Sequence, residues 1–145
     1  MNVLNDHNCF GKKEALLRYN QFIDQVQQRT GLQSRDKAVR ITRATLGTLG
    51  ERVYRSTLDD LAAQLPDKLK KLIKARAHPE MTPQDVERYS LGEFYNRVNA
   101  RADLGTLETS EEAKAVISVL RDAVTAGEWA DLRAELPEEY DQLLS

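Results

Sequence analysis

Residues 58–73, LDDLAAQLPDKLKKLI, and residues 129–144, WADLRAELPEEYDQLL, carry one pattern twice, 71 positions apart. A Leu-Pro dipeptide recurs within it, at 65–66 and at 136–137. Proline cannot continue a helix, because it lacks an N–H and clashes with the preceding turn, but it suits the start of a new one. Each copy is therefore predicted to be a pair of helices bent at its proline, and each must bury an apolar face against its neighbour or the other copy.

The segment before the first copy predicts two further helices. Residues 12–29 place apolar side chains three and four positions apart, and Gly31 stands where a C-terminal cap is expected. Ser34 can cap a second helix that runs through Gly47 and Gly50. Each of these two glycines weakens a helix by about 1 kcal/mol relative to Ala. We expect close backbone packing to compensate for this loss.

The second half repeats these signals. A Ser or Thr followed three positions later by an acid predicts a helix start. One such start, Ser56, lies in the first repeat, and later starts occur at Thr82, Ser90, Thr109 and Thr125. Phe94 and Val98 also repeat Phe22 and Val26 at inward positions, 72 positions later. Because no alternating pattern of a strand is sustained anywhere, the prediction is an all-α fold.

The predicted architecture is a tandem pseudo-repeat of helical modules packed as one compact helical bundle. We divide this single duplicated domain into an N-terminal tail (1–11), a first helical repeat (12–76), a connector (77–89) and a second helical repeat (90–145). A chain of 145 residues can bury a sizeable core without a metal or a disulfide.

Charge is unevenly distributed along the chain. Residues 1–73 hold 13 Lys and Arg against 8 Asp and Glu, whereas residues 74–145 hold 8 against 15. Opposite charges favour docking of one half on the other, or attract an external partner to either face. The N-terminus lacks the apolar run of a signal peptide, no segment is long and apolar enough to span a membrane, and the single Cys9 permits no internal disulfide. We expect a soluble, cytoplasmic protein.

Residue types that perform catalysis or bind metals form no recognisable site. Neither His7 nor His78 has a Glu three positions before it, so the pattern of a di-metal helical bundle is missing. His7 and Cys9 supply two ligands, which do not close a tetrahedral site. The acid pairs at 111–112 and 138–139 fall in first turns of predicted helices, where the helix dipole favours negative charge. The sequence therefore predicts no catalytic residue, no cofactor and no metal.

Basic residues crowd the second arm of the first copy. They are Lys68, Lys70, Lys71, Lys74 and Arg76. Such a cluster either forms the solvated face of a helix or neutralises phosphates of a nucleic acid. A second basic cluster lies near the start of the helix that follows Ser34 and consists of Arg35, Lys37, Arg40 and Arg43. Trp129, the only tryptophan, replaces Leu58 in the repeat, so core packing is its default role and an exposed anchor for a partner the alternative.

These features together resemble a bacterial family known as domain of unknown function 2267. The resemblance covers about residues 19–145, and its most specific element is LAAQLP at 61–66, repeated as LRAELP at 132–137. It implies a small, all-helical bacterial protein. It supplies no reaction, cofactor or catalytic residue.

We expect a non-enzymatic protein-protein interaction or structural module that engages another protein or a second copy of itself, and no membrane. A nucleic-acid-associated protein that uses the basic arm at 68–76 is the first alternative. The second alternative is a pocket for a small apolar ligand between the repeats.

Overall fold

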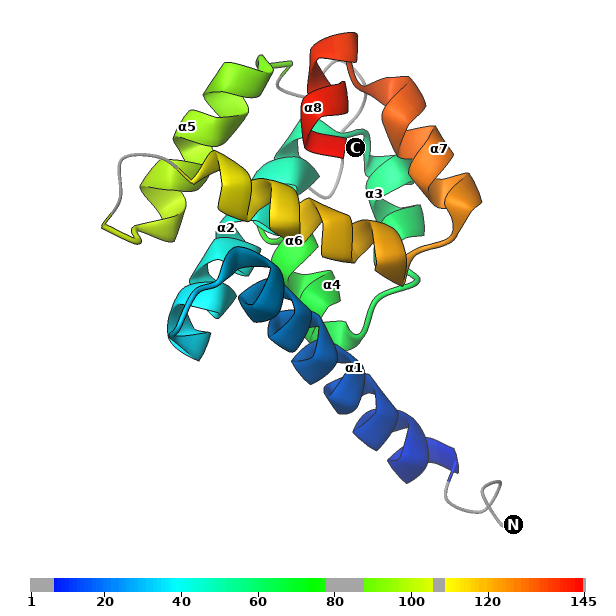
Figure 1. The fold of residues 1–145 in the computed structure, drawn as a ribbon. Coiled ribbons are helices and arrows are strands. Elements are labelled where there is room, and N and C mark those ends of the chain that lie inside the picture. The colour runs from blue at the N-terminus through cyan, green and yellow to red at the C-terminus, as the bar shows by residue number, and fades with distance from the viewer. Residues whose placement is uncertain (1–6, 78–87, 106–108, 145) are drawn as a thin grey trace.

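Helices make up most of the chain that the structure describes (Figure 1). This computed structural model describes residues 7–77, 88–105 and 109–144, with side chains from Arg18 onward. The helices are α1 (His7–Thr30), α2 (Arg35–Arg52), α3 (Arg55–Ala62), α4 (Asp67–Lys74), α5 (Leu91–Ala102), α6 (Ser110–Ala123), α7 (Ala126–Glu135) and α8 (Asp141–Leu144), with a 3₁₀ turn at Glu138–Tyr140 before α8. These ranges contain no strand, so the all-α prediction is confirmed.

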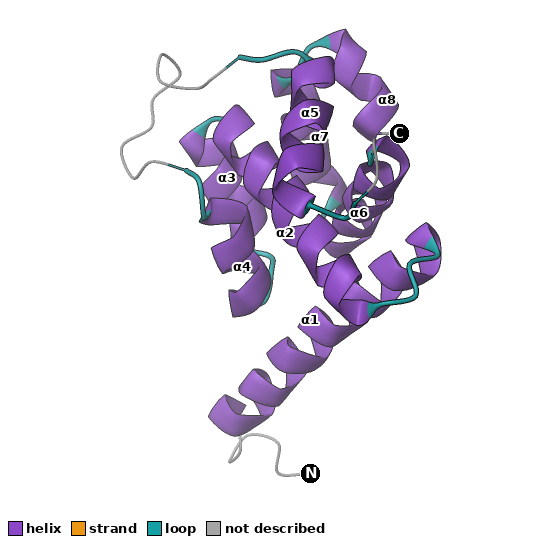
Figure 2. Ribbon diagram, turned by 90° about the vertical axis from the view of Figure 1, so that its left-hand side faces the viewer, coloured by secondary structure: helices purple, strands orange, loops and turns teal. Residues whose placement is uncertain are grey.

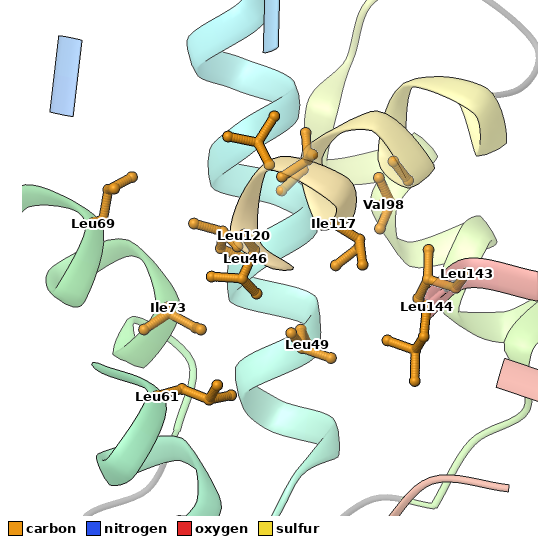
Figure 3. Close-up of a cluster of buried hydrophobic side chains, with 14 of the residues drawn as sticks. Leu46, Leu49, Leu61, Leu69, Ile73, Val98, Ile117, Leu120, Leu143 and Leu144 are labelled. Carbon is orange, nitrogen blue, oxygen red and sulfur yellow. The ribbon is translucent and has the colours of Figure 1, made fainter. Parts of the chain in front are cut away.

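Helix α2 is the centre of the fold and packs against α1, α4, α5 and α6. Every residue at 44–53 is buried, as expected for a helix that other helices surround. Figure 3 shows Leu46 and Leu49 of α2 between Ile73 of α4 on one side and Val98 of α5 on the other. The apolar side chains of α2 thus join the two halves of the chain.

The glycines of α2 face α4. A Cβ on Gly50 would lie 1.9 Å from the carbonyl oxygen of Ile73, so any other residue would push the two helices apart. A Cβ on Gly47 would lie 3.7 Å from the carbonyl oxygen of Leu72 and from the side chain of Arg76, which is ordinary contact. The close packing expected at both glycines is therefore obligatory only at Gly50.

Three predicted helix caps are confirmed. The hydroxyls of Ser34, Ser90 and Thr125 accept the backbone N–H groups of Lys37, Glu93 and Glu128 at 3.3, 3.2 and 3.4 Å. Gly31 follows α1 with φ of +74°, a left-handed conformation that glycine adopts without strain. The cap chemistry of the sequence therefore sets the bounds of α1, α2, α5 and α7.

Two predicted caps are wrong in part. Helix α3 begins at Arg55 with Tyr54 in the cap position, which places Ser56 inside its first turn. Thr109 does precede α6, but its side chain makes no cap hydrogen bond. The chain breaks its helices at Pro66 and Pro137 as predicted, each one position before the next helical residue. The start signal at Thr82 lies outside the described residues.

Helix α1 begins at His7, within the segment 1–11 that we predicted to be a tail. Its C-terminal half packs on the body through Phe22, Ile23 and Val26, which are buried. Its N-terminal half extends beyond the other helices in both views (Figures 1 and 2). The apolar spacing in the sequence indicated a helix only from residue 12 onward.

One continuous cluster of buried apolar side chains runs through both halves of the chain. Phe22 and Val26 belong to it, as do their predicted counterparts Phe94 and Val98. Helices from both halves are thus needed to enclose the core. None of the described helices combines the length and the apolar character that crossing a bilayer requires.

Candidate anion-binding pocket

The five residues of the predicted basic arm do not share one surface. Leu69 and Ile73 bury one face of α4 and leave its lysines outward. Lys70 lies 3.9 Å from a carboxylate oxygen of Asp67, Lys74 lies 3.1 Å from one of Asp59, Lys68 lies 5.1 Å from the ring centroid of Tyr19, and Lys71 is exposed. Arg76, just beyond the end of α4, lines a pocket.

Three arginines line this pocket, which has a volume of about 340 Å³. Arg43 comes from α2, Arg76 follows α4 and Arg101 lies near the end of α5. The other lining residues are Ala44, Gly47 and Ala75. Among the described residues of this lining there is no acid, so this part of the pocket concentrates positive charge.

The lining of the pocket depends on the small residues of α2. Arg76 lies over Gly47, because its Cδ is 3.7 Å from the position that a Cβ would occupy there. Neither Arg43 nor Arg76 forms an ion pair or a hydrogen bond with another described residue, and both are exposed. Their guanidinium groups are therefore accessible to a ligand from solvent.

Residues of α2 hold the side chain of Arg101 in place. Its Nη1 donates to the carboxylate of Glu51 at 2.7 Å and to the hydroxyl of Thr48 at 2.9 Å. Glu51 is almost buried, with 9% of its side chain exposed, and it also accepts Nη1 of Arg97 at 3.0 Å. Both bonds of Arg101 use Nη1, so they hold this nitrogen against Thr48 and Glu51 of α2.

These two arginines stabilise the ionised form of Glu51. Burial alone would raise the pKa of Glu51, but the hydrogen bonds and positive charges of Arg101 and Arg97 outweigh burial and hold its pKa below the ordinary value. Glu51 is therefore ionised at neutral pH. A buried carboxylate between two arginines keeps both in place, since removing it would leave two charges poorly compensated.

Tyr89 packs against the residues that hold Arg101. The phenol of Tyr89 donates to the carbonyl oxygen of Thr48 at 2.6 Å, and the guanidinium carbon of Arg97 lies 4.1 Å from the centroid of its ring. Burial, together with the nearby charge of Glu51, raises the pKa of Tyr89 far above its ordinary value. The phenol therefore stays protonated and acts as a donor.

A second depression, of about 350 Å³, lies between α1, α4 and α6. This depression is the candidate for the alternative function considered from the sequence, a pocket for a small apolar ligand between the repeats. Phe22, Leu69 and Val119 contribute apolar surface to it, whereas Arg18 and Asp122 contribute charge. Its lining is therefore mixed, and the charges within it have both signs.

The remaining candidates from the sequence lie elsewhere. Trp129 is buried, with 6% of its surface exposed, and belongs to the core cluster. The side chains of His7 and Cys9 and the whole of His78 lie outside the described residues. Within the described part of the chain, no three His, Cys, Asp or Glu side chains are grouped so that they could hold a metal ion.

Sequence reasoning placed Arg43 and Arg76 in separate basic clusters and did not single out Arg101. A usable signal for Arg101 was present. Arg97 and Arg101 are one helical turn apart and each precedes an inward residue, Val98 or Ala102. Arginines at the edge of an apolar row favour a partner on the facing helix.

Comparisons with known proteins identify the family. A search of curated proteins gives no match. The sequence model of one family, described as "Uncharacterized conserved protein (DUF2267)", matches residues 19–143. This range agrees with the resemblance carried by the Leu-Pro repeat and covers nearly the whole chain, so the protein belongs to the DUF2267 family.

Proposed function

We propose that the protein is a non-enzymatic binding module that holds an acidic group of another protein in the arginine pocket. The presence of Arg43, Arg76 and Arg101 in one pocket, whose described lining residues include no acid, supports this proposal. Guanidinium groups offer N–H donors in a fixed fork that matches carboxylate and phosphate oxygens. Lys68 and Lys71, on the exposed face of α4, add longer-range attraction for a negatively charged partner.

Binding fits the chemistry of this lining better than catalysis does. Arginine side chains keep their protons in proteins, so they do not act as general bases. The other described residues of the lining, Ala44, Gly47 and Ala75, provide no nucleophile and no proton carrier. The pocket can hold and orient an anion, and we assign no reaction to it.

Nucleic-acid binding through residues 68–76 is the second candidate. It is less favoured, because Lys70 and Lys74 lie beside Asp67 and Asp59, which lowers the charge available to a phosphate backbone. The chain as a whole also carries a net charge of −2. A complex with DNA or RNA at micromolar protein that weakens steeply with salt would favour this candidate over a protein partner.

We further propose that the two halves are a tandem pseudo-repeat. In support, α2 and α6 end 71 positions apart, and α3 and α7 begin 71 positions apart. In addition, α1 packs on α6 as α2 packs on α5. The two prolines share a backbone conformation, with φ −64° and ψ 158° at Pro66 and φ −62° and ψ 160° at Pro137. Their environments differ, since Pro66 is buried and Pro137 exposed.

Affinity capture from an extract of the native host tests the proposed function. The baits are the wild type, Arg43→Glu/Arg76→Glu, and the matched control Lys37→Glu/Arg121→Glu, which reverses two exposed charges outside the pocket. We expect the wild type and the control to retain the same proteins and the pocket variant to lose them. If all three baits retain the same proteins, the pocket is not the contact surface.

Self-association is checked separately. Sedimentation of the purified chain over a range of concentrations would reveal a dimer. A dimer that Arg43→Glu/Arg76→Glu dissociates, and that the control variant leaves intact, would make a second copy of the chain the partner.

A further inference from the structure

We infer that the arginine pocket is a site for a phosphate monoester. The inference rests on the proposed function, because it names the anionic group that the same pocket holds. Two sources present this chemistry, a phosphorylated side chain of a partner protein and a small free phosphate ester. The central observation is the charge of the pocket, since a carboxylate carries one negative charge whereas a phosphate monoester carries about 1.5 to 2 at neutral pH.

Two positive charges of the pocket lack a carboxylate partner in the described part of the chain. The ion pairs behind the pocket are Arg101 with Glu51 at 2.7 Å, Arg97 with Glu51 at 3.0 Å and Arg97 with Glu93 at 2.9 Å. These two arginines and two acids balance one another. Arg43 and Arg76 remain, and together they supply the two charges that neutralise a dianion.

The end of α4 does not cancel this charge. Ala75, which caps α4, lines the pocket, and the last carbonyls of a helix carry about half a negative charge. Two full positive charges exceed that amount. The carbonyls instead favour an arginine near them, which is consistent with Arg76 lying over Gly47 close to the carbonyl oxygen of Leu72.

The size and shape of the pocket favour a monoester over a nucleic-acid strand. Its volume of about 340 Å³ is near the lower end of the range of roughly 300–1,000 Å³ for small-ligand sites. It can hold a phosphate and the few atoms that carry it. Arg43, Arg76 and Arg101 come from three separate segments and line one pocket, whereas a strand presents singly charged diesters along a line.

Calorimetric titration of the full chain with phenyl phosphate, phenyl sulfate and benzoate tests the inference. Phenyl sulfate keeps the tetrahedral head group but has one charge, and benzoate is planar with one charge. We expect phenyl phosphate to bind roughly tenfold more tightly than either, because it has the additional charge. Equal affinity for the phosphate and the sulfate, or no binding of phenyl phosphate, would overturn the inference.

Variants locate the binding. Arg43→Gln and Arg76→Gln should each weaken phenyl phosphate binding about tenfold, since each removes charge-assisted hydrogen bonds. Arg121→Gln removes an exposed arginine outside the pocket and should leave the affinity unchanged. All three positions are exposed, so circular dichroism should report the same fold. If Arg76→Gln binds as well as the wild type, the ligand is not in this pocket.

Treating the host extract with phosphatase before capture separates the two sources. Loss of the captured proteins would identify a phosphorylated side chain, whereas unchanged capture together with phenyl phosphate binding would identify a free ester. The inference and the proposed function can also fail separately. Capture that depends on Arg43 and Arg76 without phenyl phosphate binding overturns only the inference, and phenyl phosphate binding without any captured protein overturns only the function.

Discussion

At the scale of single residues, the two glycines of α2 differ by a single contact. Gly50 faces the carbonyl oxygen of Ile73 with no space for a Cβ, whereas Gly47 has ordinary clearance. We therefore expect Gly50→Ala to lower the free energy of unfolding by about 3 kcal/mol. Gly47→Ala should leave it unchanged or raise it by up to about 1 kcal/mol, because alanine favours the helix.

Urea unfolding followed by the fluorescence of Trp129 measures both changes. The two variants serve as controls for each other, since they make the same substitution one turn apart in one helix. Equal losses of stability in Gly47→Ala and Gly50→Ala would show that α2 and α4 do not approach most closely at Gly50.

Trp129 is a second test of packing at one residue. It is buried, and its indole Nε1 has no hydrogen-bond partner among the described residues. Trp129→Ala should cost about 3–5 kcal/mol, because it leaves a cavity, whereas Trp129→Phe should cost about 1–2 kcal/mol, because no hydrogen bond is lost. Circular dichroism during urea unfolding measures both. An unchanged midpoint in Trp129→Ala would place the indole on the surface.

The success of sequence reasoning at single residues depended on how local each interaction is. Ser34 and Ser90 were correctly predicted as caps, because a cap is decided within four residues. Ser56 failed as a cap because distant groups intervene. The carboxylate of Glu135, from α7, accepts the backbone N–H of Tyr54, and Asp59 pairs with Arg55 and with Lys74 rather than completing a capping box.

At the scale of helices, apolar spacing predicted which faces turn inward, but the site required knowledge of how helices pair. The apolar spacing of α4 indicates an inward face formed by Leu69, Leu72 and Ile73. Leu69 and Ile73 are buried, whereas Leu72 is half-buried against the core. The pocket, by contrast, joins Arg43, Arg76 and Arg101, which lie on segments far apart in the sequence. Spacing gives the face of each helix and does not give its neighbour, so the arginine pocket could not be predicted.

The pairing of α2 with α5 can be tested through Glu51. Its carboxylate is the shared acceptor for Arg97 and Arg101, so Glu51→Gln should lower the free energy of unfolding by about 2 kcal/mol at neutral pH. The pKa of Glu51 is lower in the folded protein than its ordinary value of 4.5. The stabilisation that ionised Glu51 gives the folded protein is therefore fully present when the pH is above the ordinary pKa. It is lost as the pH falls through the pKa of Glu51 in the folded protein.

The expected pH dependence of stability follows from the lowered pKa of Glu51 in the folded protein. The difference in unfolding free energy between the wild type and Glu51→Gln should be constant from about pH 7 to about pH 5, and it should shrink below that. Urea unfolding at several pH values measures it. Glu138→Gln, at an exposed position, is the matched control and should stay within about 0.5 kcal/mol of the wild type. A difference that grows on acidification would contradict the role of Glu51.

At the scale of the whole molecule, net charge explains little of how the halves associate. Arg29 of the basic half does pair with Asp122 of the acidic half at 2.8 Å. The ion pairs of the almost buried Glu51 have the opposite arrangement of charges. Their acid, Glu51, belongs to the basic half, and their arginines, Arg97 and Arg101, belong to the acidic half. The shared apolar core, rather than the difference in net charge, is therefore the main force that holds the halves together.

The way in which the helices alternate between the halves leads to a last prediction. Helix α1 packs on α6 and α2 packs on α5, so each half covers apolar faces of the other. Fragments 1–82 and 83–145, cut within the predicted connector, should each have little helix alone, because short isolated helices are marginal in water. An equimolar mixture should recover helix content and a cooperative thermal transition, which circular dichroism measures. A cooperative transition in either fragment alone would show that one half folds independently, and the core would then be two cores in contact rather than one shared by both halves.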